Sequence, residues 1–242
     1  MLLMRIIHCQ HDGLPRKISL HLLSRLAVLV DYYECKKPVQ FFANRWIDEL
    51  KPNFPRRYSR ELMLWLFVSL VFDKRDLLVE STSIAVTQSK APIPSAGLPI
   101  PPRVLSKSEQ ISRVYYKNSP ANNLCLDALN DRREKGIKLI FDRLRLQREK
   151  YLQSGSACSF QCASTLLGML DKLIYRHRDY FKEVPAPYVG LNYLKLAAIL
   201  DGIEVQKVGV LSLHEYGRIH KCGHGYGLLK VPANLAGFES FS

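Results

Sequence analysis

Apolar residues with helical spacing run through the first ninety positions and constrain the fold of this chain more than any other feature. Ser19 is a residue type that accepts hydrogen bonds from the first turn of a helix. The apolar residues behind it keep the i, i+3, i+4 spacing of one helix face: Leu22, Leu23, Leu26, Ala27, Val30 and Tyr33. The same spacing predicts further helices at 38–50, 59–72 and 74–88. Because the links between them are short, we expect successive helices to pack antiparallel.

The composition allows these helices to bury a sizeable core. Of 242 residues, 47% are hydrophobic and 24% are charged, which is ordinary for a globular protein. We therefore expect every aromatic residue in the first ninety positions to lie in the core, Trp46 and Trp65 included. The most apolar run, Leu62 to Phe72, is far shorter than the roughly 20 residues that span a bilayer, so we interpret it as a buried helix and expect no membrane partner.

A proline-rich segment separates these helices from the rest of the chain. Five prolines lie within 91–102, where they exclude a helix and favour an extended connector. Residues 103–125 are polar and include the loop signature Asn118–Asn123. Relative to the family resemblance described below, 106–125 also looks like an insertion. We therefore divide the chain into a helical region at 1–90, the connector with its insertion at 91–125, and a second helical region at 126–242.

Helices also begin the region after residue 125. Apolar spacing predicts a long helix at 126–151 and another at 158–175, followed by a short helix for which Asn192 is the N-cap. From Val205 onward the chain is rich in glycine and β-branched residues, which indicates irregular structure or one short hairpin. The predicted fold is mostly α: an antiparallel helical array with a Pro-rich connector and a short irregular or β C-terminal segment.

The chain is strongly basic, with a net charge of +13. Eight of its positive residues lie on the predicted long helix: Arg132, Arg133, Lys135, Lys138, Arg143, Arg145, Arg148 and Lys150. Such a charge attracts nucleic acid, an anionic membrane surface or an acidic protein. Because no aromatic residues alternate with these charges to stack on bases, we interpret the helix as a solvated basic face and keep nucleic-acid binding as the alternative.

One group of residues has the character of metal ligands. Cys158 and Cys162 are four positions apart, so on a helix they share a face. His220 and Cys222 are two positions apart, so in an extended segment their side chains point to the same side. The four together predict a closed tetrahedral zinc site that is structural and not catalytic. A long stretch of chain separates the two halves, and reduced cysteines packed in the interior are the alternative.

Other chemistry is poorly supported. The sequence has no phosphate-binding glycine loop followed by Lys and Ser or Thr, and no nucleophile elbow. His214 or His224 would serve in place of His220 as a zinc ligand. A cysteine- or zinc-dependent hydrolase, with Cys158 as nucleophile and His220 as its base, is a third reading. We expect no enzyme, and the six cysteines in a chain without an export signal indicate the cytoplasm or nucleus.

Several stretches of the sequence resemble fungal proteins with a BTB (POZ) domain. The following stretches resemble the closing helices of such a domain: Ile6–His8, Leu14–Arg16, Leu22–Leu23, Leu26–Tyr33 and Phe41–Ile47. The following stretches resemble the helical region that comes after it: Gly97–Pro101, Cys158–Gly168, Pro185–Pro187 and His220–Cys222. The resemblance covers about two-thirds of the chain.

This resemblance implies a protein-interaction module and not an enzyme. BTB domains self-associate and recruit protein partners, some of them cullin-type ubiquitin ligases. Members of this family also carry a Cys-x-x-x-Cys pair and a later His-x-Cys. The resemblance therefore supports the predicted zinc site. The strands and helices that open a BTB domain would lie before Met1, so we expect a scaffold or adaptor fragment of BTB type.

The zinc site predicts that purified protein contains about one zinc ion per chain. Cys158→Ala and Cys222→Ala should each remove it, whereas Cys9→Ala, outside the ligand set, should not. A structural ion contributes folding free energy directly, so a chelator should lower the melting temperature of the wild-type chain. Elemental analysis and thermal melting measure both effects, and a metal-free protein with unchanged melting contradicts the site.

Overall fold

The computed structural model describes residues 2–10, 12–95, 97–98, 126–153, 160–182 and 184–201. Helix dominates these residues, which form eight α-helices and no strand. The mostly α fold expected from the sequence is thereby confirmed. The predicted irregular or β segment after Val205 lies outside the described residues.

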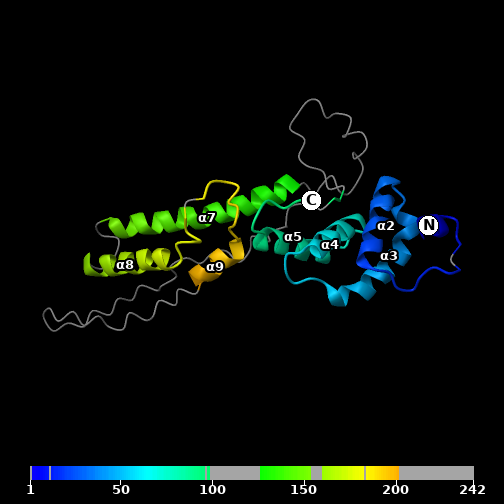
Figure 1. The fold of residues 1–242 in the computed structure, drawn as a ribbon, viewed down its shortest axis with the longest axis horizontal. Coiled ribbons are helices and arrows are strands. Elements are labelled where there is room, and N and C mark those ends of the chain that lie inside the picture. The colour runs from blue at the N-terminus through cyan, green and yellow to red at the C-terminus, as the bar shows by residue number, and fades with distance from the viewer. Residues whose placement is uncertain are drawn as a thin grey trace, which may run out of the picture. The chain divides into compact units, whose positions relative to one another are not determined.

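The described chain divides into two compact units, and the boundary falls inside one helix. Figure 1 labels most of the helices. The first unit ends at Arg133 and the second begins at Glu134. The elements are α1 (Leu2–Ile7), α2 (Leu20–Tyr32), α3 (Lys36–Leu50), the short 3-10 helix η1 (Lys51–Asn53), α4 (Arg60–Val71), α5 (Arg75–Gln88), α7 (Leu126–Leu152), α8 (Phe160–Arg176) and α9 (Tyr193–Asp201). The three-part division at 1–90, 91–125 and 126–242 stays a prediction.

Helix α4 is the centre of the first unit. Every residue from Leu62 to Val71 is buried, because this helix is apolar on all sides and has no face suited to water. Helices α2 and α5 pack against it. Trp65 is only 2% exposed and packs against Phe54, with 5.5 Å between the ring centroids. Trp46 is equally buried, so the expectation for both tryptophans is confirmed.

Side-chain caps begin three of the helices. The Ser19 hydroxyl accepts a hydrogen bond from the Leu22 amide at 3.2 Å, and the Ser59 hydroxyl accepts one from the Leu62 amide at 3.3 Å. At α9, the Asn192 side-chain oxygen accepts from an amide three residues ahead at 2.9 Å. Each cap satisfies an amide that has no partner inside its helix. The caps expected at Ser19 and Asn192 are thereby confirmed.

Three helices of the first unit end on a residue other than glycine in the left-handed conformation. Cys9, Glu34 and Asp73 have φ values of 54°, 53° and 51°. After α2, the Cys35 amide then donates to the Val30 carbonyl at 3.1 Å, and α1 and α4 close with the same pattern. This arrangement satisfies carbonyls at the helix end, although a residue with a Cβ costs roughly 1–2 kcal/mol in this conformation.

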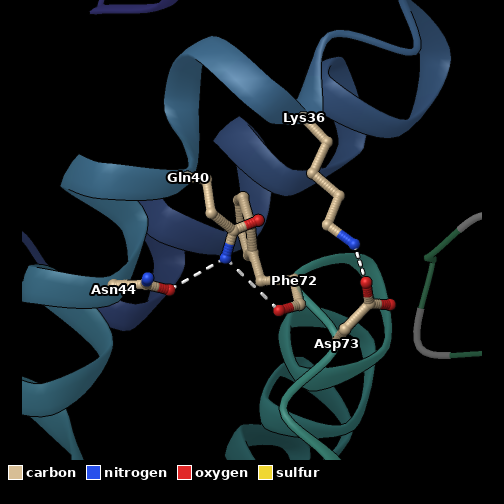
Figure 2. Close-up of polar contacts among 5 residues, drawn as sticks. All are labelled: Lys36, Gln40, Asn44, Phe72 and Asp73. Atoms are coloured by element: carbon tan, nitrogen blue, oxygen red, sulfur yellow. Dashed lines mark hydrogen bonds and ion pairs between the residues drawn. The ribbon is translucent and has the colours of Figure 1, made fainter.

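Polar contacts join the start of α3 to the end of α4 (Figure 2). Lys36 forms an ion pair with Asp73, and partial burial of the ammonium group lowers the pKa of Lys36. The Gln40 amide nitrogen donates to the Asn44 side-chain oxygen at 2.8 Å and to the Phe72 carbonyl at 3.5 Å. A carbonyl at the end of α4 thus receives a partner from a neighbouring helix.

In the second unit, α8 lies beside α7 (Figure 1), and Arg148 of α7 contacts Asp171 of α8 at 3.0 Å. The Phe141 ring of α7 stacks on Tyr188 and meets Phe181 edge to face, with centroid distances of 6.2 and 6.4 Å. Aromatic residues of the α8–α9 link therefore pack against Phe141 of α7.

The central position of α4 predicts a large effect for one truncation. Trp65→Ala should lower the free energy of unfolding by about 3–5 kcal/mol, because the cavity left by a buried aromatic side chain cannot collapse fully. Phe41→Ala is the matched control, since the Phe41 side chain is 72% exposed, and it should change that free energy by less than about 0.5 kcal/mol. Urea unfolding followed by circular dichroism measures both, and equal effects contradict the packing described for α4.

Candidate interaction site

The outer side of α2 carries an exposed stripe of mostly apolar residues, here named the outer stripe. Its members are Leu22, Arg25, Leu29, Tyr32 and Tyr33. Their four apolar or aromatic side chains have exposed fractions of 41%, 44%, 68% and 63% in chain order. The two tyrosine rings meet edge to face at 4.9 Å between centroids. Helix α2 therefore has an apolar side in contact with solvent as well as one in the core.

The position of the outer stripe corrects two expectations. Leu22 and Tyr33 were expected on the buried face, and every aromatic residue of the first ninety positions was expected in the core. The buried face of α2 is instead formed by residues such as Leu23, Leu26 and Val30, and each residue step rotates about 100° around a helix. Leu22 is therefore turned out of the core, and Tyr33 lies at the C-cap beyond the packed turns.

A pocket of about 480 Å³ opens beside the start of α4. Its lining residues in the described chain are Tyr58, Ser59, Arg60, Met63 and Pro94. The Ser59 hydroxyl is already used as a helix cap, and it also contacts Glu61. The backbone amide of Glu61, and then this hydroxyl, lower the pKa of the Glu61 carboxyl. The lining combines the polar side chains of Tyr58, Ser59 and Arg60 with the apolar side chains of Met63 and Pro94.

Arg133 of α7 is buried in the first unit. Its side chain is 1% exposed, and its Nε donates to the Ser89 carbonyl at 3.3 Å. Ser89 caps the C-terminus of α5, where a positive charge is favourable. Burial raises the pKa of the nearby Tyr58 phenol, and the charge of Arg133 offsets part of that increase. Arg133 thus fixes the start of α7 to the end of α5.

This position also corrects the expectation of a uniform basic face on α7. Arg133 is in the core and not on that face. The exposed positive residues of the helix are Lys135, Lys138, Arg145, Arg148 and Lys150. Exposed leucines lie on α7 as well, with Leu139 at 37% and Leu146 at 66% exposure, and Arg148 is paired with Asp171. The solvent side of α7 is therefore mixed in character.

The described residues include one member of the predicted zinc site. Of its four residues only Cys162 is described, and it is half-buried on α8 and not in a disulfide. Cys158, His220 and Cys222 lie outside the described residues, as do the substitutes His214 and His224. Within the described ranges no group of metal-ligating side chains gathers. The zinc site stays a prediction.

No family model, no curated protein and no solved structure matches this chain. The BTB resemblance therefore stays a prediction. In the part of the chain that the structure describes, no helix is both long and apolar enough to cross a membrane.

Sequence reasoning missed the outer stripe as a functional feature. Its signal was present, because α2 has more apolar residues than one buried face can use: Leu20, Leu22, Leu23, Leu26, Ala27, Val28, Leu29 and Val30. A helix that packs on one side only carries a narrower apolar stripe. The surplus of apolar residues indicates a second surface on α2.

The buried position of Arg133 predicts a marked loss of stability on its removal. Arg133→Ala should lower the free energy of unfolding by about 2–4 kcal/mol, because it leaves a cavity and takes the donor from a buried carbonyl. Arg145→Ala on the exposed side of the same helix should change it by less than about 0.5 kcal/mol. Chemical denaturation compares the two variants, and an Arg133→Ala protein as stable as wild type contradicts the role given to this side chain.

Proposed function

We propose that this chain is a non-enzymatic protein-interaction module, a scaffold or adaptor of BTB type acting in the cytoplasm or nucleus. The outer stripe of α2 carries this proposal. Isolated exposed apolar residues are common on protein surfaces, but a contiguous set marks a contact site. Tyrosine and arginine, both in the stripe, are also enriched among the residues that dominate binding energy at protein interfaces.

The packing of α2 supports a binding role. On its inner side Leu23, Leu26, Ala27 and Val30 are at most 3% exposed, so the helix is held firmly against the core. The backbone of such a helix is already ordered before a partner binds, which lowers the cost of association. The outer stripe is thus a preorganised surface.

The family resemblance supports the same function. The resembling stretch Leu26–Tyr33 includes Leu29, Tyr32 and Tyr33 of the outer stripe. What the resemblance implies is recruitment of protein partners together with self-association. A surface of exposed tyrosine and leucine side chains is chemically suited to both.

Nucleic-acid binding through α7 is the second candidate, and its exposed lysines and arginines favour it. Exposed Leu146 and the pairing of Arg148 with Asp171 weaken it, because both interrupt a phosphate-binding surface. Phosphate contacts make such binding steeply salt-dependent, so a gel shift at low and moderate salt separates the two functions.

The proposed function predicts that capture of protein partners depends on the outer stripe. The bait is the full chain, and the variant is Leu29→Glu with Tyr33→Glu, which places two charges in the surface. The control is Leu146→Glu with Leu152→Glu, which alters two exposed leucines of α7. Cross-linked pull-downs and light scattering should show partners or oligomers lost with the first pair only. A wild-type chain that is monomeric and captures no protein contradicts the function.

A further inference from the structure

The outer stripe has the spacing of a helix–helix contact. Leu22, Arg25, Leu29 and Tyr32 are separated by three, four and three positions. This alternation is the one by which two helices meet along a seam, with Tyr33 widening its end. From Leu22 to Tyr33 the stripe extends over about three turns, or roughly 17 Å of helix. An elongated surface of this kind fits another helix laid along it better than a loop or a compact side chain.

Arg25 indicates which charge a helix that covers the outer stripe must carry. It is the one charged member of the stripe and is exposed between the two leucines. Among the described residues it has no ion-pair or hydrogen-bond partner. A helix that covered the stripe would shield this guanidinium from water, which is costly unless a carboxylate faces it. The partner helix must therefore place an acidic residue opposite Arg25.

We infer that the outer stripe of α2 binds an acidic amphipathic helix of a partner protein. Leucine-type residues of that helix contact Leu22, Leu29 and the two tyrosines, and a carboxylate pairs with Arg25. This inference rests on the proposed function and names the chemistry of the partner. The net charge of +13 supports an acidic partner, because opposite charge increases the rate of encounter.

The same charges disfavour a second copy of this chain as the occupant. Two molecules of charge +13 repel each other, and a parallel seam would bring one Arg25 against the other. If light scattering shows that the stripe mediates dimer formation, a second copy, and not an acidic helix, occupies it.

The test uses two labelled peptides and the full chain. Each peptide has three heptads with leucine at the first and fourth positions. One peptide carries glutamate at the positions that flank the leucines, where it can face Arg25, and the other carries lysine there. Both are held at nanomolar concentration so that they do not pair with themselves. Fluorescence anisotropy should show saturable binding of the glutamate peptide and at least about tenfold weaker binding of the lysine peptide, a difference of about 1.4 kcal/mol.

Charge reversal supplies the specific control. Arg25→Glu should weaken the glutamate peptide at least about tenfold and strengthen the lysine peptide, because the sign at the seam is inverted. Arg45→Glu makes the same charge change at an exposed position of α3. It should change the affinity for each peptide by less than Arg25→Glu does. Leu29→Ala should weaken both peptides, whereas Leu146→Ala on α7 should not. Circular dichroism melting verifies that each variant is folded.

Three results would overturn the inference. The first is no saturable binding of the glutamate peptide. The second is an equal effect of Arg25→Glu and Arg45→Glu. The third is light scattering that shows a dimer lost with Leu29→Ala, which makes a second copy the occupant. If neither peptide binds but the full chain still captures protein partners, the proposed function holds and the acidic helix is not the partner. If the chain captures no protein either, both the proposed function and this inference are contradicted.

Discussion

Burial of α4 on all sides is the constraint on which the rest of the first unit depends. A helix with ten successive buried residues cannot fold alone, since each of its sides needs a neighbour to exclude water. Helices α2 and α5 cover it directly, and Phe54 lies against Trp65 before the helix begins. Because α4 is fixed in place, Lys36 and Gln40 of α3 can contact Asp73 and the Phe72 carbonyl at its end. The stability of α4 therefore depends on the helices that pack against it.

Local signals in the sequence were sufficient to predict most of the fold. Caps such as Ser19 and Asn192, and the apolar spacing behind them, depend on a few neighbouring residues, so they can be read without tertiary information. Pro38 was expected to open α3, yet the helix begins at Lys36, because proline is tolerated anywhere in a first turn that lacks internal amide partners. Helix α1 was not predicted, since six residues offer too short a pattern.

The candidate site was harder to predict because exposure depends on what packs against a helix. Apolar Leu22 and Tyr33 look like core residues in a linear sequence, and only the neighbours of α2 decide that they face solvent. The converse holds for Arg133, which looks like a surface charge but lies at the end of α5 with a carbonyl as its acceptor. In both cases the sequence supplied the residue type, and the tertiary contact decided its role.

The left-handed residues after α1, α2 and α4 have a practical consequence for engineering. Cys9, Glu34 and Asp73 each hold a conformation that glycine adopts without steric cost, so the native fold retains removable backbone strain at three separate junctions. Glycine at Cys9 or Glu34 would relieve it without removing the ion pair made by Asp73. Glycine at these positions offers a route to a more stable protein for crystallisation that leaves the outer stripe of α2 unchanged.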